Sequence, residues 1–370
     1  MRVIHLSTIH GPLDVRIFYK ECRTLAQAGY EVHQVVFNPP ASSQDGIAFH
    51  SIQRAARIPF IPRILSRLRN TYAVARPLRA HVYHFHDPEL VPVGLLLKLQ
   101  GAKVIYDVHE DSPQEALSIN KDRPNRGRMY FVFYVVCDWL AKWLLDGMVA
   151  ATPALVQRFR AKKTVLVQNF PIQESFQSMI SIPYADRRPV AVYVGSIAEI
   201  RGINEMVRAM SLIPSHVAAT LTLAGRYDPP ELEQEVMRLP GWDRIEFRGW
   251  LSRDEITQLL GHARLGIVLL HPTPEYLESQ PVKLYEYMAA GLPIIASDFP
   301  LWRELYEPVG CCMFVNPLDS KAIANAIEWM LDRPQEADLM GRRGIEAVKT
   351  RFNWEEEGKK LLQFYEEVVR

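Results

Sequence analysis

Short apolar runs alternate with amphipathic stretches along most of the chain. Runs rich in β-branched and aromatic residues predict strands at 2–7, 31–37, 81–86, 103–108, 147–152 and 164–168. Helical periodicity lies between them, for example at 14–28, 88–100 and 126–146. This alternation indicates a parallel sheet with helices on both faces, so the first half predicts an α/β domain.

A second series of the same kind follows after an irregular stretch. Its predicted strands lie at 190–195, 219–224, 244–248, 264–270, 293–297 and 312–315. We expect a first domain at 1–170, a linker to about Pro189, a second domain at 185–352 and a last helix at 354–370. Ligands in such sheets bind beyond the carboxyl ends of the strands, so candidate chemistry is expected there.

Composition agrees with a globular protein and adds a charge asymmetry. The 370 residues are 48% hydrophobic and 23% charged, with a net charge of +1. Residues 1–170 hold 22 Lys+Arg and 13 Asp+Glu, whereas the remaining 200 hold 21 and 29. The basic first half is expected to meet something anionic. Four cysteines without ligand spacing, and no long apolar leader, predict reduced thiols in a cytoplasmic protein.

The most informative segment carries two glutamates eight positions apart, Glu278 and Glu286. Pro281 and Gly291 bracket a helix predicted at about 281–290. Backbone N–H groups of a first helical turn have no partner within the helix and attract anions such as a diphosphate. Here they belong to Val282, Lys283 and Leu284. A carboxylate on each side could accept hydrogen bonds from sugar hydroxyls, the layout of a nucleotide-sugar.

This segment closely resembles the E-x7-E signature of the family-4 retaining glycosyltransferases. The resemblance implies the GT-B fold, in which two doubly wound Rossmann-like domains face each other across a cleft and the last helix braces the first domain. It also implies that Glu278 binds hydroxyls of the transferred sugar and that Glu286 binds the ribose. The alternative makes both ordinary solvated charges.

The strand at 190–195 ends in Gly195, and Arg201 opens the next helix. This resembles the element in which two cations of the family hold the diphosphate. The sequence departs from it, because Ser196 stands where the first cation is usual and Arg201 replaces a lysine. Lys283 is the candidate for the missing charge, and Trp250 is a candidate for contact with the base. No Asp-x-Asp triad follows a strand, so we expect metal-independent chemistry without a cofactor.

The first domain contributes His109, which follows the strand at 103–108 and matches the family's cleft histidine in position. The resemblance implies that it contacts the donor sugar at the reaction centre; a satisfied structural histidine is the alternative. His86 lies one βα unit earlier, and the histidines have no metal-ligand spacing. Gly11 is expected to let the first loop approach the donor, while Asp14 and Arg16 face the acceptor or cap a helix.

Two further stretches bear on membranes. Residues 51–80 hold seven arginines and no acid, interleaved with apolar residues, which fits an interfacial helix on anionic lipid or an ordinary basic face. The apolar stretch 129–151 is interrupted by Asp138, Lys142 and Asp146, which favours a helix packed on a sheet over a spanning one. No motif for nucleic-acid binding supports that class of partner.

The resemblance implies transfer of a sugar, with retention, from a nucleotide-sugar to a glycan or lipid-linked acceptor, as in bacterial polysaccharide assembly. UDP-glucose is the first expectation for the donor, and the protein would be cytoplasmic or peripheral on the inner membrane face. Two alternatives remain open: a nucleotide-sugar epimerase of the same fold, and a non-catalytic subunit that binds the nucleotide-sugar.

Overall fold

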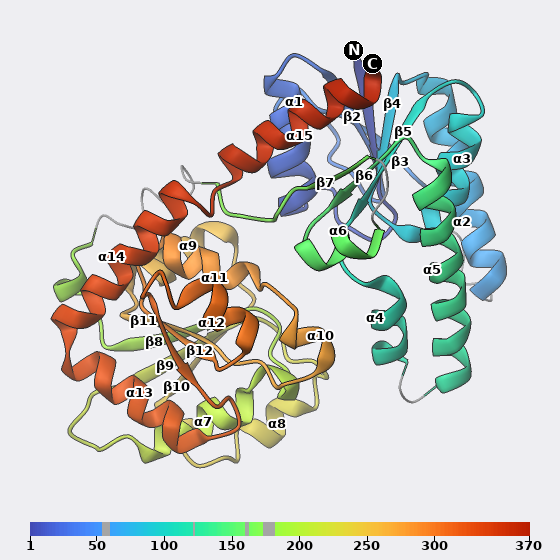
Figure 1. Cartoon of the computed structure of the whole chain (residues 1–370). Helices are drawn as coiled ribbons and strands as arrows, with labels where there is room; N and C mark the ends of the chain where they lie inside the picture. The colour runs from blue at the N-terminus through green and yellow to red at the C-terminus, as the bar shows by residue number, and fades with distance from the viewer. Residues whose placement is uncertain (54–59, 121–122, 160–162, 173–181) are drawn as a thin grey trace. The chain divides into compact units, whose positions relative to one another are not determined.

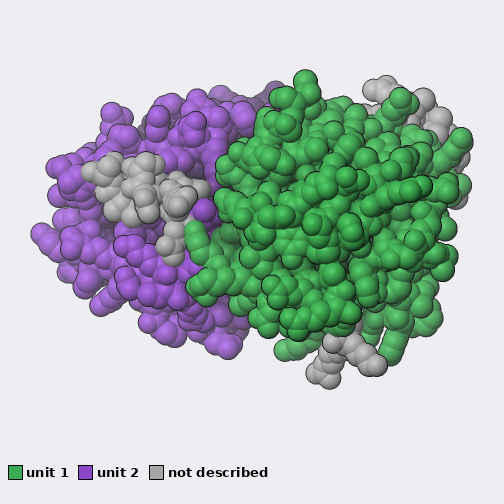
Figure 2. Space-filling model, turned by 90° about the horizontal axis from the view of Figure 1, so that it is seen from above, with its two compact units in different colours: residues 1–169, 354–370 green, residues 170–353 purple. Residues whose placement is uncertain are grey.

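The computed structural model describes residues 1–53, 60–120, 123–159, 163–172 and 182–370 (Figure 1). The chain divides into two compact units, coloured separately in Figure 2. Unit 1 comprises Met1–Asn169 together with Trp354–Arg370, and unit 2 comprises Phe170–Asn353. Part of the expected linker, residues 173–181, lies outside the described residues, as do Arg54 and Arg57 of the basic segment.

Unit 1 is built on a seven-stranded parallel sheet in the order β3-β2-β1-β4-β5-β6-β7. Its strands are β1 (Arg2–Leu6), β2 (Glu31–Val36), β3 (Ala48–Ser51), β4 (Val82–Phe85), β5 (Lys103–Val108), β6 (Gly147–Ala150) and β7 (Thr164–Leu166). The order reverses between β1 and β4, so the loops that follow these two strands flank a topological switch point. All strands expected in this half are present, and the short edge strand β3 is an addition.

Helices cover both faces of this sheet (Figure 1). They are η1 (Val15–Cys22, a π-helix), α1 (Arg23–Gln27), α2 (Phe60–Ala75), η2 (Arg76–Leu78), η3 (Pro88–Leu90), α3 (Val91–Lys98), α4 (Ser112–Ile119), α5 (Pro124–Leu144), α6 (Pro153–Phe159) and α15 (Trp354–Val369). In Figure 1, η1, α1 and α15 lie on one side and α2, α3 and α5 on the other. None of the described helices is long and apolar enough to cross a membrane.

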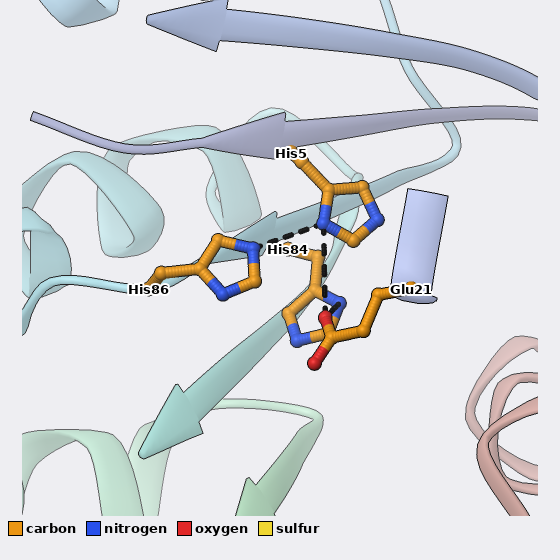
Figure 3. A group of neighbouring side chains, drawn as sticks. All are labelled: His5, Glu21, His84 and His86. Atoms are coloured by element: carbon orange, nitrogen blue, oxygen red, sulfur yellow. Dashed lines mark hydrogen bonds and ion pairs between the residues drawn. The ribbon is translucent and has the colours of Figure 1, made fainter. Parts of the chain in front are cut away.

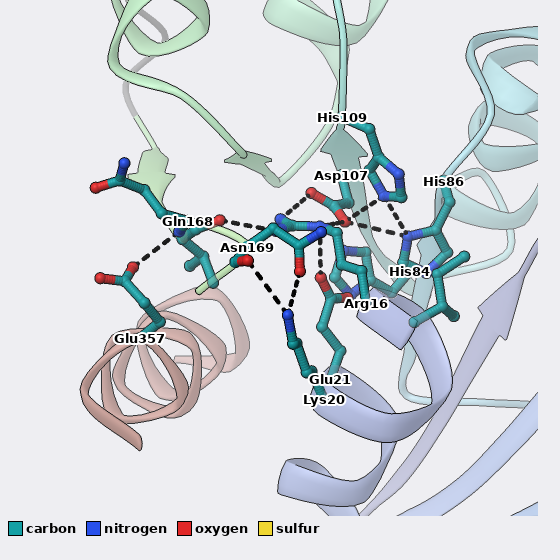
Figure 4. Close-up of polar contacts among 12 residues, drawn as sticks. Arg16, Lys20, Glu21, His84, His86, Asp107, His109, Gln168, Asn169 and Glu357 are labelled. Atoms are coloured by element: carbon teal, nitrogen blue, oxygen red, sulfur yellow. Dashed lines mark hydrogen bonds and ion pairs between the residues drawn. The ribbon is translucent and has the colours of Figure 1, made fainter. Parts of the chain in front are cut away.

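The last helix, α15, packs within unit 1 although 184 residues of unit 2 precede it in the chain. Trp354 Nε1 donates to the Thr24 hydroxyl at 2.9 Å, and Tyr365 pairs with His84 at 2.8 Å. The backbone N–H of Gln168 donates to Glu357 at 2.9 Å (Figure 4). These contacts tie α15 to α1, to the sheet and to the segment that leaves β7.

Unit 2 repeats the architecture with six parallel strands in the order β10-β9-β8-β11-β12-β13. The strands are β8 (Val190–Val194), β9 (Thr220–Ala224), β10 (Ile245–Gly249), β11 (Leu265–Val268), β12 (Ile294–Ser297) and β13 (Cys312–Val315). Its helices are η5 (Tyr184–Asp186), η6 (Glu199–Arg201), α7 (Ile203–Leu212), α8 (Leu232–Val236), η7 (Trp242–Arg244), α9 (Arg253–His262), α10 (Pro274–Leu277), α11 (Val282–Ala289), α12 (Pro300–Tyr306), α13 (Ser320–Asp332) and α14 (Pro334–Thr350).

Apolar layers hold the sheet of unit 2 between its helices. One cluster joins β8 and β9 to α7 and α13, and a second joins β11 and β12 to α11, α12 and α14. Trp302 and Tyr306 of α12 are wholly buried in the second cluster. Burying aromatic side chains of this size removes about 150–250 Å² each from water, so α12 is firmly held in unit 2. It can therefore anchor the chain segment that precedes α11.

Candidate active site

Helix α11 begins one residue later than the sequence indicates, with Pro281 as its N-cap residue. Two core side chains anchor the loop before this helix. Trp302 Nε1 donates to the Ser279 carbonyl at 2.8 Å, and the Tyr285 hydroxyl donates to Gln280 at 2.9 Å. The Leu284 N–H already donates to the Pro281 carbonyl at 3.1 Å. The first-turn donors that remain for an anion are therefore those of Val282 and Lys283.

The two glutamates of the motif are placed differently. Glu278 is the exposed C-cap residue of α10, directly before the anchored loop, while Glu286 is half-buried in the second turn of α11. The apolar side of α11 faces the core through Leu284, Tyr287 and others, while Lys283 and Glu286 are partly exposed residues of the same helix. The structure thus brings together the residues that flank the helix start.

The environment of the Lys283 amine is unusual for a charged group. Its Nζ atom is buried and has no hydrogen-bond partner among the described residues. It lies 4.1 Å from the centroid of the Tyr193 ring, and a Cβ atom on Gly195 would come within 3.1 Å of it. Burial and the positive charge of Arg201 lower the pKa of Lys283 to about 7, against a smaller opposing effect of Glu286. An anion next to Nζ would restore the charged form.

Arg201 ends η6, and Gly202 follows with φ of 73°, in the left-handed region. A Cβ atom at Gly202 would lie 2.8 Å from the Leu269 carbonyl oxygen, so a larger residue would disturb the turn that presents Arg201. The Arg201 guanidinium lies 6.0 Å from the centre of the Tyr276 ring. Arg201 and Lys283 are both expected at the phosphates, and Arg201 lies close enough to lower the pKa of Lys283.

Gly195, Arg201, Lys283, Glu278 and Glu286 together form what we call the donor-side group. A pocket of about 530 Å³ adjoins it at the ends of β8, β9 and β10. Its lining includes Gly195, Ser196, Gly225, Arg226, Trp250 and Ile256. The Trp250 side chain is 66% exposed, and the Arg226 guanidinium lies 6.0 Å from its ring centre. An exposed aromatic plane beside a pocket suits a stacked ring, so Trp250 stays the candidate for base contact.

In unit 1, the predicted histidines converge on a buried carboxylate, that of Asp107 (Figure 4). Arg16 donates to both of its oxygens, at 2.8 and 2.7 Å. His109 Nε2 lies 2.7 Å and His86 Nδ1 3.2 Å from the same carboxylate oxygen. We call Arg16, His86, Asp107 and His109 the Asp107 cluster. Arg16 therefore neither caps a helix nor faces solvent; its carboxylate partner lies 91 positions away, beyond the reach of spacing rules.

The electrostatics of this cluster fix its charges. Burial opposes ionisation of Asp107, but the Arg16 guanidinium and His109 outweigh it and hold the pKa of Asp107 well below its ordinary value. Burial lowers the pKa of His86 to about 4, against the opposing effect of Asp107. At neutral pH the cluster therefore contains an Arg16–Asp107 ion pair and a neutral His86, and the carboxylate orients the His109 ring.

A second group adjoins the Asp107 cluster and shares His86 with it. It consists of His5, Glu21, His84 and His86 (Figure 3). His5 and His84 are opposite each other in the β1–β4 register, and His5 Nδ1 lies 2.9 Å from His86 Nε2. One ligand atom from each of the four residues lies within 4.8 Å of the others. The spacing of these residues in the sequence does not indicate a metal site, because the pairing of β1 with β4 brings them together.

Burial is the main influence on the pKa values of this group. Burial, followed by the nearby charge of Asp107, raises the pKa of Glu21 well above its ordinary value, and burial lowers the pKa values of His5 and His84. His5 and His84 are therefore neutral at neutral pH, and the Arg16 Nε lies 3.1 Å from Glu21. These residues could present a metal with three imidazoles and a carboxyl, and among the described residues the His5 and His84 Nε2 atoms and both Glu21 oxygens have no hydrogen-bond partner.

The loop after β1 serves mainly to start η1. Asp14 accepts hydrogen bonds from the backbone N–H groups of Arg16 and Ile17, at 2.9 and 3.0 Å, so it is the cap of this helix. Gly11 is exposed, and no protein atom within 4 Å would meet a Cβ atom there. Its expected approach to a donor remains a prediction.

Comparison with known proteins gives the same assignment from both units. The model of the family described as a glycosyl transferase 4-like domain matches residues 16–167. The model described as glycosyl transferases group 1 matches residues 188–333. The first match contains His86, Asp107 and His109, and the second contains every residue of the donor-side group.

Individual relatives are distant. An alpha-D-kanosaminyltransferase of Streptomyces kanamyceticus is 24% identical over 50% of this chain and 47% of its own length. The O-antigen chain mannosyltransferase RfbU of Salmonella typhimurium is 23% identical over 72% of this chain and 74% of its own. Several of the curated relatives, the first among them, are thus matched over about half of their length.

Solved structures agree over the full chain. A sucrose-phosphate synthase from Thermosynechococcus elongatus has a TM-score of 0.77, 20% identity, and coverage of 100% of this chain and 99% of its own. Anabaena HepE in complex with UDP-glucose has a TM-score of 0.74, 16% identity, and coverage of 99% and 100%. At these identities the likeness shows the fold, which is GT-B. From the two family matches and this fold, the chain belongs to the family-4 glycosyltransferases of the GT-B fold.

Proposed function

We propose that this protein transfers a hexose from a nucleotide-diphosphate sugar to a glycan or lipid-linked acceptor. The observation that supports it best is Lys283, a buried cation without a hydrogen-bond partner in the part of unit 2 that the structure describes. Leaving such a group unpaired costs free energy, which a bound anion would offset. The diphosphate would meet Lys283, Arg201 and the N–H groups at the start of α11.

The two glutamates would then bind the two ends of the donor. Glu286 would accept from ribose hydroxyls, and Glu278 from hydroxyls of the transferred sugar. In the proposed step the bond between the anomeric carbon and the β-phosphate oxygen breaks, and the acceptor oxygen attacks the same face. Because the attack is on the face from which the phosphate departs, the configuration is retained, and the acceptor proton passes to the departing phosphate oxygen. His109, oriented by Asp107, would contact the sugar.

UDP-glucose is the donor we propose first. The support is indirect: HepE, which shares the fold, was solved with UDP-glucose. The O-antigen and kanosamine names of two relatives agree with transfer to a glycan or a related hydroxyl acceptor. We further propose that the protein works on the cytoplasmic side, in polysaccharide assembly.

We also propose that the reaction needs no metal. The leaving diphosphate can be stabilised by Lys283, Arg201 and the positive end of α11, which do the electrostatic work of a magnesium ion. The group of His5, Glu21, His84 and His86 is wholly buried and is not part of this proposal.

The experiment that tests the proposal is a UDP-release assay with UDP-glucose, with and without acceptor alcohols and lipid extracts. A transferase releases UDP and forms a glycoside of retained configuration, identified by NMR. An epimerase on the same fold would change the sugar without a need for acceptor. A non-catalytic binding subunit would bind UDP-glucose and release nothing, and either outcome would contradict the proposal.

A further inference from the structure

Helix α5 exposes apolar residues on the face that points away from its own unit. Its buried residues are Gly127, Cys137, Asp138 and Ala141. At 100° per residue, the opposite side of the helix carries a continuous apolar stripe. The stripe, called here the tryptophan face, consists of Met129, Val132, Val135, Val136, Trp139 and Trp143.

These side chains are strongly exposed, from 40% for Val135 to 66% for Trp143. Surface helices of soluble proteins normally have polar residues there. A contiguous exposed apolar patch on a folded unit marks an interaction site. The sequence-based expectation of a helix packed on a sheet is met by the buried side of α5 but does not explain this outer side.

The charged residues of α5 that flank the tryptophan face are cationic. Arg128 and Lys142 flank the stripe near its two ends, and the Lys142 Nζ lies 5.7 Å from the Trp143 ring centre. The single acid in the sequence of α5, Asp138, is buried on the opposite side and bonded to Arg158 at 2.8 Å. The outer side of α5 therefore offers apolar and cationic groups without an anion of its own.

We propose that α5 docks unit 1 on an anionic phospholipid bilayer, with the tryptophan face in the headgroup region. Tryptophan favours the boundary between headgroups and acyl chains, and flanking cations attract anionic lipid. A second copy of this chain fits less well. An antiparallel two-fold contact between two α5 helices would place Arg128 of one copy near Lys142 of the other, which is repulsive.

This location differs from the one expected from the sequence, the basic segment 51–80. In the described part of that segment, Arg67 donates to the buried Glu89 at 2.6 Å and lies 6.0 Å from the Phe37 ring centre. The half-buried Arg67 is therefore tied to an acid of the interior of unit 1. The helix α2 that carries it lies on the same side of the sheet as α5, so the exposed Arg63 and Arg69 of α2 can add to the contact.

The test is flotation of the intact protein with vesicles, one set containing phosphatidylglycerol and the other phosphatidylcholine alone. Wild-type protein should float with the anionic vesicles, and its tryptophan emission should shift to shorter wavelength. Trp139→Gln with Trp143→Gln should reduce the bound fraction more than tenfold. Leu212→Gln with Leu339→Gln, which changes exposed apolar residues of unit 2, is the matched control and should float like wild type.

Charge-reversal variants separate the electrostatic contribution to membrane binding from the apolar one. Arg128→Glu with Lys142→Glu should abolish the preference for anionic vesicles, and high salt should weaken wild-type binding without removing it. The proposal is overturned if wild type stays unbound at low salt, or if the tryptophan pair changes only a monomer–dimer equilibrium in sedimentation. Flotation uses neither donor nor acceptor, and an unchanged circular dichroism spectrum and melting temperature of the variants would show that they fold, so this result is independent of the proposed transfer.

Discussion

The Asp107 cluster and the donor-side group handle charge in opposite ways. In the Asp107 cluster the guanidinium of Arg16 is paired with a carboxylate through two hydrogen bonds, and two imidazoles complete the set. In the donor-side group, Lys283 is buried with no hydrogen-bond partner among the described residues. The first arrangement is complete within the protein, whereas the second lacks an anion.

The comparison separates a group that orients from a group that binds. A complete ion pair fixes geometry and contributes to folding, and its removal leaves an uncompensated charge. An unpaired cation destabilises the free protein but contributes to affinity when its ligand arrives. The two groups should therefore respond in opposite directions when their central charges are removed.

The largest effect is expected for Asp107→Asn. The change removes the carboxylate that accepts two hydrogen bonds from the buried Arg16 and leaves Glu21, 3.1 Å from its Nε, as the neighbouring carboxyl. It should lower the free energy of unfolding by up to about 3–5 kcal/mol. Since the pKa of Asp107 is lowered in the folded state, its contribution is present above the unfolded value and is lost as pH falls. Urea denaturation followed by circular dichroism measures the loss.

The matched control is Asp146→Asn. Asp146 is partly exposed and pairs with Lys98 at 2.9 Å, so its removal should change stability by about 1 kcal/mol or less. Equal losses for the two variants would show that the Asp107 cluster is not the buried ion pair described above.

The pH dependence of UDP binding comes next. The free Lys283 loses its proton above pH 7, and the diphosphate binds the protonated form. UDP affinity should therefore fall roughly tenfold per pH unit from about pH 7 to pH 9, with proton uptake on binding at pH 8. Calorimetry in two buffers of different ionisation enthalpy measures both. A flat profile without proton uptake would mean that Lys283 does not touch the phosphates.

The two glutamates should differ in kinetics. Glu278→Ala should lower turnover more than tenfold, because a hydrogen bond to the transferred sugar is lost in the transition state. Glu286→Ala should mainly weaken UDP binding, by about tenfold. Glu304→Ala, at an exposed position of α12, serves as the control. Steady-state kinetics and calorimetry together test the split, which fails if both glutamate variants change the same parameter.

The smallest expected effect is that of metal removal. Activity should survive excess EDTA, and metal analysis of the purified protein should give well below one equivalent. Loss of activity that magnesium or manganese restores would point to a metal at the phosphates. A stoichiometric metal that resists EDTA would instead direct attention to His5, Glu21, His84 and His86.

Local patterns in the sequence were enough to predict the strands of both sheets and the position of α11. Alternating β-rich and helical runs indicated every strand except β3, whose four residues lie at the sheet edge with none fully buried. Proline and glycine near the ends of α11 indicated its bounds to within a residue. These features depend on neighbouring residues, which a sequence displays directly.

Long-range pairs were not accessible in this way. The contact between Lys283 and Gly195 depends on how α11 packs against β8, and the Arg16–Asp107 pair joins η1 to β5. The sequence left Arg16 between two surface roles because its carboxylate partner is reached only through the sheet. The exposure of the tryptophan face of α5 could not be predicted either, since apolar periodicity alone does not say which residues face solvent.

The central claim is that Lys283 is an unpaired cation awaiting a diphosphate. The most direct test compares the binding of UDP and of uridine to the wild type and to Lys283→Met by calorimetry at pH 7. The account predicts that the wild type prefers UDP strongly, that the variant loses most of this preference while uridine affinity stays unchanged, and that the variant melts at a higher temperature. A variant that keeps the full preference for UDP, or that is less stable than wild type, would contradict it.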